Sequence, residues 1–233
     1  MKFQGMVNYG SLTAVLALSV AACSRTNPEI AYASTSGASS TAQSTESGTP
    51  AKGAALRLVL APTGNAVRYR VREQLVGHDL PNDAVGETAK LTGAISIDSS
   101  GNVIRDVSKF TVDAGSFVSD KDRRDGFVRG RLLEADAYPT IVFVPTGVRG
   151  VSLPLPKSGT RDIEMTGDLT VRGVTRPTTW KGTAEFKDAG VTGAVATAFT
   201  FDDMKIEQPR VPVLLSVADT IKLEISFNLV QQR

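Results

Sequence analysis

The sequence predicts an all-β domain, an extended antiparallel β-barrel of about eight strands with one short helical segment. Apolar and polar residues alternate with a period of two through most of residues 54–233, as in strands with one buried face. Turn motifs rich in Gly, Asn, Asp and Ser separate the alternating runs. Because a long meander of strands removes its exposed edges by closing on itself, we expect a barrel.

The alternation defines about nine strand segments. It is clearest in 221–229, where Ile, Leu, Ile, Phe and Leu occupy every second position. In chain order, we expect strands at 55–61, 67–71, 89–98, 103–112, 140–148, 163–171, 179–187, 191–201 and 221–229. Turns are expected at 62–65, 99–102 and 188–190.

One stretch has helical spacing. Ser119 and Asp120 can cap a helix over 121–125, and Val128 and Leu132 then fall four residues apart on one face. We therefore expect a lipocalin-like barrel with this segment as a short helical plug.

Four glycines bear on whether the barrel is filled. These glycines fall in the same every-second-residue series as the apolar residues that flank them, so we expect them to face the inside of the barrel. They are Gly93, Gly167, Gly182 and Gly193. A barrel of about eight strands either fills with side chains or holds one small ligand. Two interpretations stay open: the glycines leave free volume in the lumen, or they permit the strong coiling of a closed barrel.

The N-terminus predicts export and a lipid anchor. Residues 1–22 read as a lipoprotein signal peptide, whose apolar run of 11 residues (12–22) is too short to span a bilayer. This run ends in Val20-Ala21-Ala22-Cys23, which resembles a bacterial lipobox, where the cysteine is acylated after cleavage; an ordinary export signal is the alternative. Ser24 in place of Asp indicates outer-membrane rather than inner-membrane retention. We expect an envelope lipoprotein that faces the periplasm of a two-membrane cell.

Residues 23–53 are predicted to be the lipidated cysteine and a flexible linker. Ser, Thr, Gly and Ala occupy 20 of the 30 positions from 24 to 53. Such a segment buries too little apolar surface to offset its chain entropy. Residues 54–233 remain as one globular domain.

Composition argues against most cofactor chemistry. The chain has one His and one Cys, so it can form neither a His/Cys zinc site nor an internal disulfide. No G-x-G or Walker-type phosphate loop is present, and a net charge of +2 gives no sign of nucleic-acid binding. His78 beside Asp79 invites a general-base role, but no G-x-S-x-G nucleophile motif accompanies it. We expect no enzyme, no metal and no cofactor.

Two charged segments leave alternatives open. Arg68, Arg70 and Arg72 form a stripe that could touch anionic lipid or simply face solvent. The run 120–125 could bind an anionic head group or begin a helix with internal salt bridges.

Three motifs resemble the YceI-like family of bacterial periplasmic proteins: Arg124-Asp125, the segment from Tyr138-Pro139 to Phe143, and Gly167-Asp-Leu-Thr-Val-Arg-Gly-Val-Thr-Arg-Pro177. The resemblance extends over nearly all of 54–233. It implies a lipocalin-like barrel that holds a polyisoprenoid or similar long apolar chain, such as an isoprenoid quinone or polyprenol. It also implies that Arg124 and Asp125 dock the helical segment onto the barrel.

The inward positions are the candidate ligand contacts. On the strands these are Tyr69, Val71, Ile95, Phe110, Phe143, Met165, Leu169, Trp180, Phe199 and Phe227, and on the helical segment Phe127 and Leu132. The leading hypothesis is non-catalytic binding, sequestration or transport of an amphiphilic lipid in the lumen. The alternative is a surface-tethered stress or interaction lipoprotein with a solid barrel. The sequence leaves open whether the chain forms a homodimer.

Overall fold

The computed structural model describes residues 53–232. The predicted signal peptide, Cys23 and all but the last residue of the predicted linker lie outside these residues, so those assignments stay predictions.

The described residues form eleven strands. Their bounds are β1 (Ala54–Leu60), β2 (Ala66–Leu75), β3 (Asn82–Thr88), β4 (Leu91–Asp98), β5 (Lys109–Asp113), β6 (Val118–Ser119), β7 (Thr140–Arg149), β8 (Gly159–Val171), β9 (Val174–Lys187), β10 (Gly190–Thr200) and β11 (Leu214–Gln231). All pairings between these strands are antiparallel.

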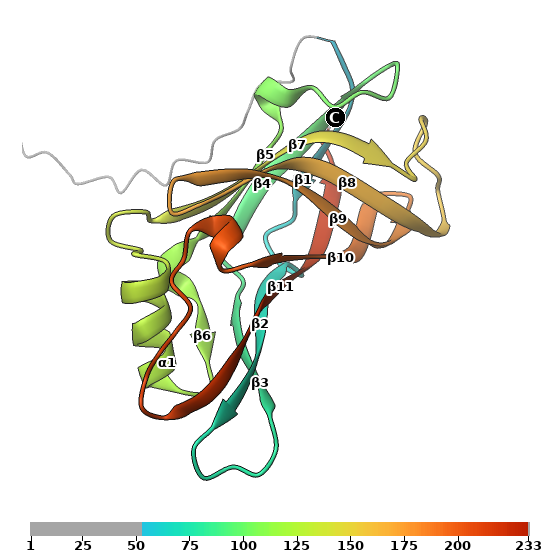
Figure 1. Cartoon of the computed structure of the whole chain (residues 1–233). Helices are drawn as coiled ribbons and strands as arrows, with labels where there is room; N and C mark the ends of the chain where they lie inside the picture. The colour runs from blue at the N-terminus through green and yellow to red at the C-terminus, as the bar shows by residue number, and fades with distance from the viewer. Residues whose placement is uncertain (1–52, 233) are drawn as a thin grey trace, which may run out of the picture. The chain divides into compact units, whose positions relative to one another are not determined.

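Eight of the strands close into a barrel (Figure 1). The ring runs β1-β4-β5-β7-β8-β9-β10-β11, and the pairing of β1 with β11, as in Leu60 with Leu229, completes it. The predicted fold class, a closed antiparallel barrel with one short helix, is thus confirmed.

The long strand β11 extends the sheet beyond the barrel. Only residues 229–231 of its free edge pair with β1, whereas residues 214–226 pair with β2. Strands β3 and β6 follow β2, so the sheet continues beyond the barrel as a β2–β3–β6 extension, which we call the branch sheet.

The helical segment packs beside the branch sheet, as α1 (Asp122–Phe127) and a π-helical turn (Val128–Leu132) (Figure 1). The predicted cap is wrong: within residues 53–232, the N-cap is Lys121, whose side chain makes no capping bond. Ser119 instead belongs to β6, where its Oγ accepts from the Lys121 N–H at 3.3 Å and donates to Asp125 at 2.6 Å. Ser119 lies two residues before the N-cap, so its hydroxyl binds the segment that leads into α1 and the Asp125 side chain, not the free N–H groups of the first turn.

Strand β3 was not predicted because its inward positions carry no large apolar residue. Ala84, Gly86 and Thr88 are buried there. The Tyr69 ring on β2 covers Gly86, and a Cβ at this glycine would lie 2.3 Å from Tyr69 Cε1. The aromatic ring fills the space that β3 leaves, which hides the strand from a pattern of hydrophobicity.

The predicted strand 103–112 is also interrupted. A 3₁₀ turn (Arg105–Val107) replaces its first half, and β5 begins only at Lys109. The Ser108 side chain fixes this turn, since its hydroxyl donates to Ile104 O at 2.7 Å and accepts from the Ser96 N–H at 2.9 Å.

The interpretation of the inward glycines as free lumen volume is wrong, because the backbone of a neighbouring strand occupies the place of each missing side chain. A Cβ at Gly182 would lie 1.9 Å from Ala194 O, and at Gly193 it would lie 2.2 Å from Thr183 O. Gly93 and Gly167 have the same close backbone contact, at 2.3 and 2.4 Å. These glycines allow adjacent strands to approach closely and coil.

Candidate functional site

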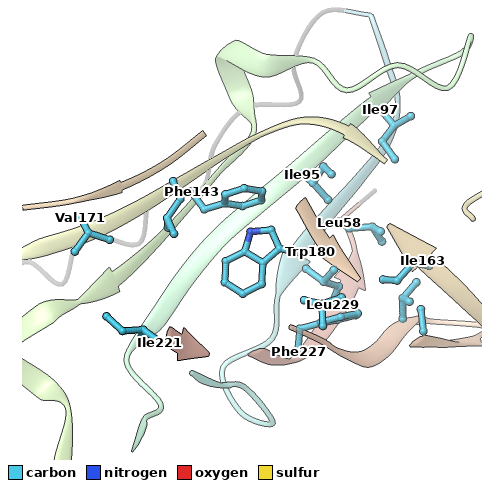
Figure 2. Packing of buried hydrophobic residues seen from close by; sticks show 14 of the residues in the cluster. Leu58, Ile95, Ile97, Phe143, Ile163, Val171, Trp180, Ile221, Phe227 and Leu229 are labelled. Carbon is cyan, nitrogen blue, oxygen red and sulfur yellow. The ribbon is translucent and has the colours of Figure 1, made fainter. Parts of the chain in front are cut away.

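The barrel core contains an apolar cavity of about 110 Å³, which we call the barrel cavity. Most of its wall is formed by the inward-facing apolar residues of the barrel strands. The Trp180 ring packs against Phe143, with ring centroids 5.7 Å apart (Figure 2). Seven predicted contacts lie in its wall: Ile95, Phe110, Phe143, Met165, Leu169, Trp180 and Phe227.

A second apolar cavity, of about 90 Å³, lies where the π-helical turn meets the barrel and the branch sheet; we call it the helix cavity. Four predicted contacts line it: Tyr69, Val71, Leu132 and Phe199.

The two cavities share part of one wall. Phe117, Ile141 and Leu223 line both of them. The barrel and helix cavities are therefore neighbouring compartments of one apolar interior, and these three side chains separate them.

Eleven of the twelve predicted contact residues thus border one of the two cavities, and Phe127 borders neither. Successive helical residues point about 100° apart, so Val128 and Leu132 face the helix cavity together while Phe127 turns aside. Contact of any of these residues with a ligand stays a prediction.

Sequence reasoning missed the cavity residues that lie outside the alternating strands. Phe117 follows a 3₁₀ turn, Leu155 lies in the loop after β7, and Ile206 follows the turn after β10. Period-two alternation cannot place such residues. The only signal was a large apolar side chain in a polar or proline-rich loop.

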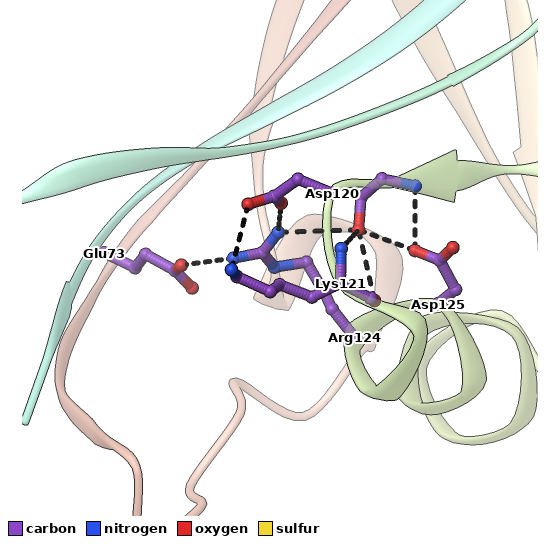
Figure 3. A network of polar contacts seen from close by, with 6 residues as sticks. Glu73, Asp120, Lys121, Arg124 and Asp125 are labelled. Carbon is purple, nitrogen blue, oxygen red and sulfur yellow. Dashed lines mark hydrogen bonds and ion pairs between the residues drawn. The ribbon is translucent and has the colours of Figure 1, made fainter.

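A polar cluster around the nearly buried Glu73–Arg124 pair lies between α1 and strands β2 and β6 (Figure 3). Arg124 Nη2 donates to Glu73 Oε1 at 2.7 Å, and the two side chains are only 15% and 8% exposed. Arg124 also pairs with Asp120, and Asp125 accepts from the Ser119 N–H at 2.9 Å. These bonds join α1 to β2 and β6, so Arg124 and Asp125 dock the helical segment onto the branch sheet, whereas the resemblance implied docking onto the barrel.

Tyr69 connects this cluster to the apolar interior. Its ring lines the helix cavity, and burial raises the pKa of its phenol to about 12. The value of about 12 is the net result, in which the charge of Arg124 opposes the effect of burial and the charges of Asp125 and Glu73 add to it. The phenol is therefore neutral at physiological pH.

The arginine stripe is paired with acidic residues on the outer face of the branch sheet. Arg70 and Arg72 both reach Asp83, at 3.1 and 3.3 Å, and Arg68 pairs with Glu87. This favours a solvated, salt-bridged face over an anion site. His78 is exposed in the turn after β2, with Nδ1 3.4 Å from Val76 O.

Residues 53–232 contain no group of three or more His, Cys, Asp or Glu side chains placed to hold a metal ion. Within the same residues, no helix has both the length and the apolar character needed to cross a membrane.

Comparison with known proteins agrees with this architecture. Residues 59–229 match the model of the YceI-like domain family. A UPF0312 protein of Pseudomonas putida is 31% identical over 139 residues, which cover 55% of this chain and 65% of that protein. A UPF0312 protein of Pseudomonas savastanoi pv. phaseolicola is 30% identical over the same shares. The chain thus matches just under two thirds of the length of these curated relatives.

One solved structure has the same fold over nearly its whole length. It is a polyisoprenoid binding domain from Saccharophagus degradans, with a TM-score of 0.58 and 14% sequence identity. The similarity covers 77% of this chain and 99% of that domain.

Proposed function

This chain belongs to the YceI-like family, and we propose that its barrel domain binds the apolar chain of an isoprenoid or similar amphiphilic lipid, without catalysing a reaction. The related fold of a polyisoprenoid binding domain supports this proposal. The observation that carries it is the pair of adjoining cavities walled by apolar side chains.

Apolar cavities of this size bind hydrocarbon. An engineered apolar cavity of about 150 Å³ stays dry and takes up benzene. The barrel and helix cavities, at about 110 and 90 Å³, are of the same order. A chain that passes from one to the other has to displace the side chains of Phe117, Ile141 or Leu223.

Binding of an apolar chain requires only a cavity of matching shape and apolar contacts along its wall. Burial of each methylene contributes about 0.8 kcal/mol, so ten buried carbons give about 8 kcal/mol before ordering costs. A binding free energy of about 8 kcal/mol corresponds to a Kd of about 1 μM, before the ordering costs are subtracted. The side chains of the polar cluster hydrogen-bond to one another, and we assign them no catalytic role.

We further propose that Cys23 is acylated and holds the barrel domain at the periplasmic face of the outer membrane. The lipobox-like residues before Cys23 support this proposal. A membrane-tethered binding protein would exchange an isoprenoid quinone, a polyprenol or a similar lipid with the bilayer beside it.

Native mass spectrometry tests the lipid-binding proposal. Residues 24–233 would be purified from bacteria without detergent, and bound molecules extracted with solvent. We expect a co-purified isoprenoid or fatty species, or binding of added polyprenol or quinone. If the purified chain carries nothing and binds neither, the alternative of a solid-barrel interaction lipoprotein replaces the proposal.

A matched pair of variants on β9 locates the binding site. Ala184 lines the barrel cavity and is buried, whereas the adjacent Thr183 is exposed. Ala184→Phe should weaken lipid binding by about tenfold or more, because excluding two or three methylenes forfeits about 0.8 kcal/mol each. Thr183→Phe should bind like the wild type. Equal affinities for the two folded variants would place the ligand outside the barrel.

A further inference from the structure

Four large apolar side chains are exposed together where the branch sheet ends. Val76 and Leu80, in the loop between β2 and β3, are 54% and 77% exposed. Val213 and Leu215, where β11 begins, are 60% and 61% exposed. The Val76 N–H donates to Val213 O at 3.0 Å, so the two segments lie side by side. We call these four residues the apolar tip; Figure 1 shows the β2–β3 loop at the end of the branch sheet that is remote from the barrel.

The grouping of these side chains is unusual. Single exposed apolar residues are common on protein surfaces, whereas a group of them marks a binding surface. Within residues 53–232, only three other large apolar side chains are exposed, and they are scattered over β6, the segment before β7 and the far end of β11: Val118, Tyr138 and Val230.

Prolines restrict the backbone beside the apolar tip. Pro81 follows Leu80, and Pro212 precedes Val213. A proline fixes its own φ and favours an extended conformation in the residue before it. The exposed side chains are therefore presented by restricted loops, which lowers the entropy cost of binding through them.

The size of the apolar tip argues for a lipid bilayer rather than a protein partner. A stable protein interface takes about 20–30 residues from each partner, and the tip supplies four. The exposed charges on the same loops have both signs, as in Asp79 and Arg210, so they form no surface for a highly charged partner. Apolar side chains flanked by polar groups suit a membrane interface, where the apolar part enters the acyl region and the polar groups stay among the head groups.

The length of chain before the barrel domain favours the same partner. The predicted linker, residues 23–53, can extend over about 100 Å. An anchor at Cys23, as proposed above, would keep a bilayer within reach of the tip. Because a flexible tether supplies an effective concentration of about millimolar, a few apolar side chains are enough to hold the domain on the membrane.

We propose that the apolar tip inserts into the lipid bilayer and brings the helix cavity next to the membrane. The strands that lead to the tip also line this cavity, since Val71 and Ile221 are cross-strand partners on β2 and β11 and both lie in its wall. A lipid chain that leaves the bilayer along these strands meets the helix cavity before the barrel cavity. The role of the cavity rests on the proposed lipid-binding function, whereas insertion of the tip does not.

Fluorescent labels at single sites test the insertion. Residues 24–233 contain no cysteine, so one introduced cysteine carries a polarity-sensitive fluorophore at a chosen position. Leu80→Cys and Leu215→Cys place the label on the apolar tip, and Val230→Cys, at the other end of β11, is the control. Vesicles of phosphatidylethanolamine and phosphatidylglycerol would be added up to millimolar lipid, the concentration that a tether supplies. We expect both tip labels to brighten and shift to the blue and the control label to keep its spectrum. Unchanged tip labels, or an equal shift at Val230, would overturn the proposal.

Substitution of the tip measures its share of vesicle binding. Leu80→Ser combined with Leu215→Ser should weaken binding by about tenfold or more, because both side chains lose apolar burial in the bilayer. Val118→Ser combined with Val230→Ser is the matched control, since it removes two exposed apolar side chains outside the tip. The control should bind vesicles like the unsubstituted chain, and circular dichroism would verify that both variants are folded. Equal weakening in the two variants would overturn the proposal.

The remaining outcomes identify other occupants of the tip and separate this inference from the lipid-binding function. If the tip labels shift with protein concentration without vesicles and native mass spectrometry shows a dimer, the tip is a subunit interface and the proposal fails. If the tip inserts but the barrel binds no polyprenol or quinone, the lipid-binding function fails and insertion stands. If the barrel binds these lipids while the tip labels stay unchanged, insertion alone fails.

Discussion

Glu73 and Arg124 show how single side chains fix the helical segment to the sheet. Their carboxylate and guanidinium lie 2.7 Å apart in a nearly buried site. Removal of Glu73 takes away the buried partner of Arg124 and leaves it only the exposed carboxylate of Asp120. The pair therefore specifies where α1 sits, and with it the wall of the helix cavity.

We predict that Glu73→Gln lowers the free energy of unfolding by about 1.5–3 kcal/mol, the usual worth of a hydrogen bond to a charged group, because Arg124 keeps its pair with Asp120. Urea unfolding followed by circular dichroism measures it. Arg149→Met is the control: this arginine pairs with Glu164 at 3.3 Å but is 85% exposed. Its loss should change stability by no more than about 1 kcal/mol. Similar effects of the two substitutions would show that burial does not strengthen the Glu73–Arg124 pair.

Tyr69 gives the domain a pH dependence on the alkaline side. Its folded-state pKa is raised, chiefly by burial, from 10.0 to about 12. The folded protein thus holds the phenolic proton more tightly than the unfolded chain. The resulting stabilisation is fully present below pH 10 and is lost as the pH rises through about 12.

Comparison with Tyr69→Phe isolates this effect. The free energy of unfolding of each protein would be measured between about pH 8 and pH 12. We expect the wild type to lose more stability than the variant above pH 10. Parallel curves would contradict the assignment of the raised pKa to Tyr69, since all other titrating groups are shared.

At the scale of the element, glycines and aromatic rings together determine how the strands pack. Phe110 is the cross-strand partner of Gly93, and Phe227 that of Gly193. A Cβ at either glycine would lie 2.7 Å from an atom of that phenylalanine ring. The ring thus covers the bare backbone, as Tyr69 covers Gly86, and the strand beneath it can bend.

We predict that Gly182→Ala destabilises the barrel by about 1–3 kcal/mol or more, because its Cβ meets a backbone carbonyl that cannot rotate away. Gly126→Ala is the control: it lies in α1 with nothing within 4 Å of the added Cβ. There the substitution should stabilise by about 0.4–1 kcal/mol, through helix propensity and a smaller unfolded-state entropy. Chemical unfolding distinguishes the two, and a harmless Gly182→Ala would show that β10 can move away from β9.

Part of the family motif that spans residues 167–177 is explained by the turn between β8 and β9. Arg172 and Gly173 adopt positive φ values of 49° and 73° in this turn. The Arg172 guanidinium pairs with Glu134, at the end of the helical segment, and a Cβ at Gly173 would lie 3.1 Å from Tyr138 Cε1. The Arg-Gly pair therefore docks the hairpin onto the end of the helical segment.

Sequence periodicity predicts a barrel well because each strand has one buried face. Leu223 and Phe227 follow this rule, and both line the barrel cavity. Periodicity fails where a residue is chosen by a distant contact, as in β3, where Gly86 makes room for the Tyr69 ring of β2. The helix cavity was least predictable, since Phe117 and Ile206 reach it from loops.

At the scale of the whole molecule, β11 unites the two compartments. Its inward residues run from Ile221, in the wall of the helix cavity, to Leu229, in the wall of the barrel cavity. The same strand pairs with β1 to close the barrel and with β2 to begin the branch sheet. Barrel closure, docking of the helical segment and the apolar interior are thus coupled through one element.

Acylation of Cys23 would tether the whole molecule to a membrane. If Cys23 is acylated, Cys23→Ser should release the protein from the membrane fraction, because a chain without an acyl group loses its hydrophobic anchor. Lipid binding by the barrel should not change, since the cavities are formed by residues between 58 and 229. Cell fractionation with immunodetection measures release, and extraction of the purified variant measures binding.

A second substitution tests where the anchor resides. Ser24→Asp keeps the acylated cysteine but supplies the residue associated with inner-membrane retention. We expect this variant to stay membrane-bound and to move from the outer- to the inner-membrane fraction. Retention of Cys23→Ser at the membrane would contradict the anchor, whereas an unmoved Ser24→Asp would contradict only the assignment to the outer membrane. The pair thus separates whether the protein is tethered from where it is tethered.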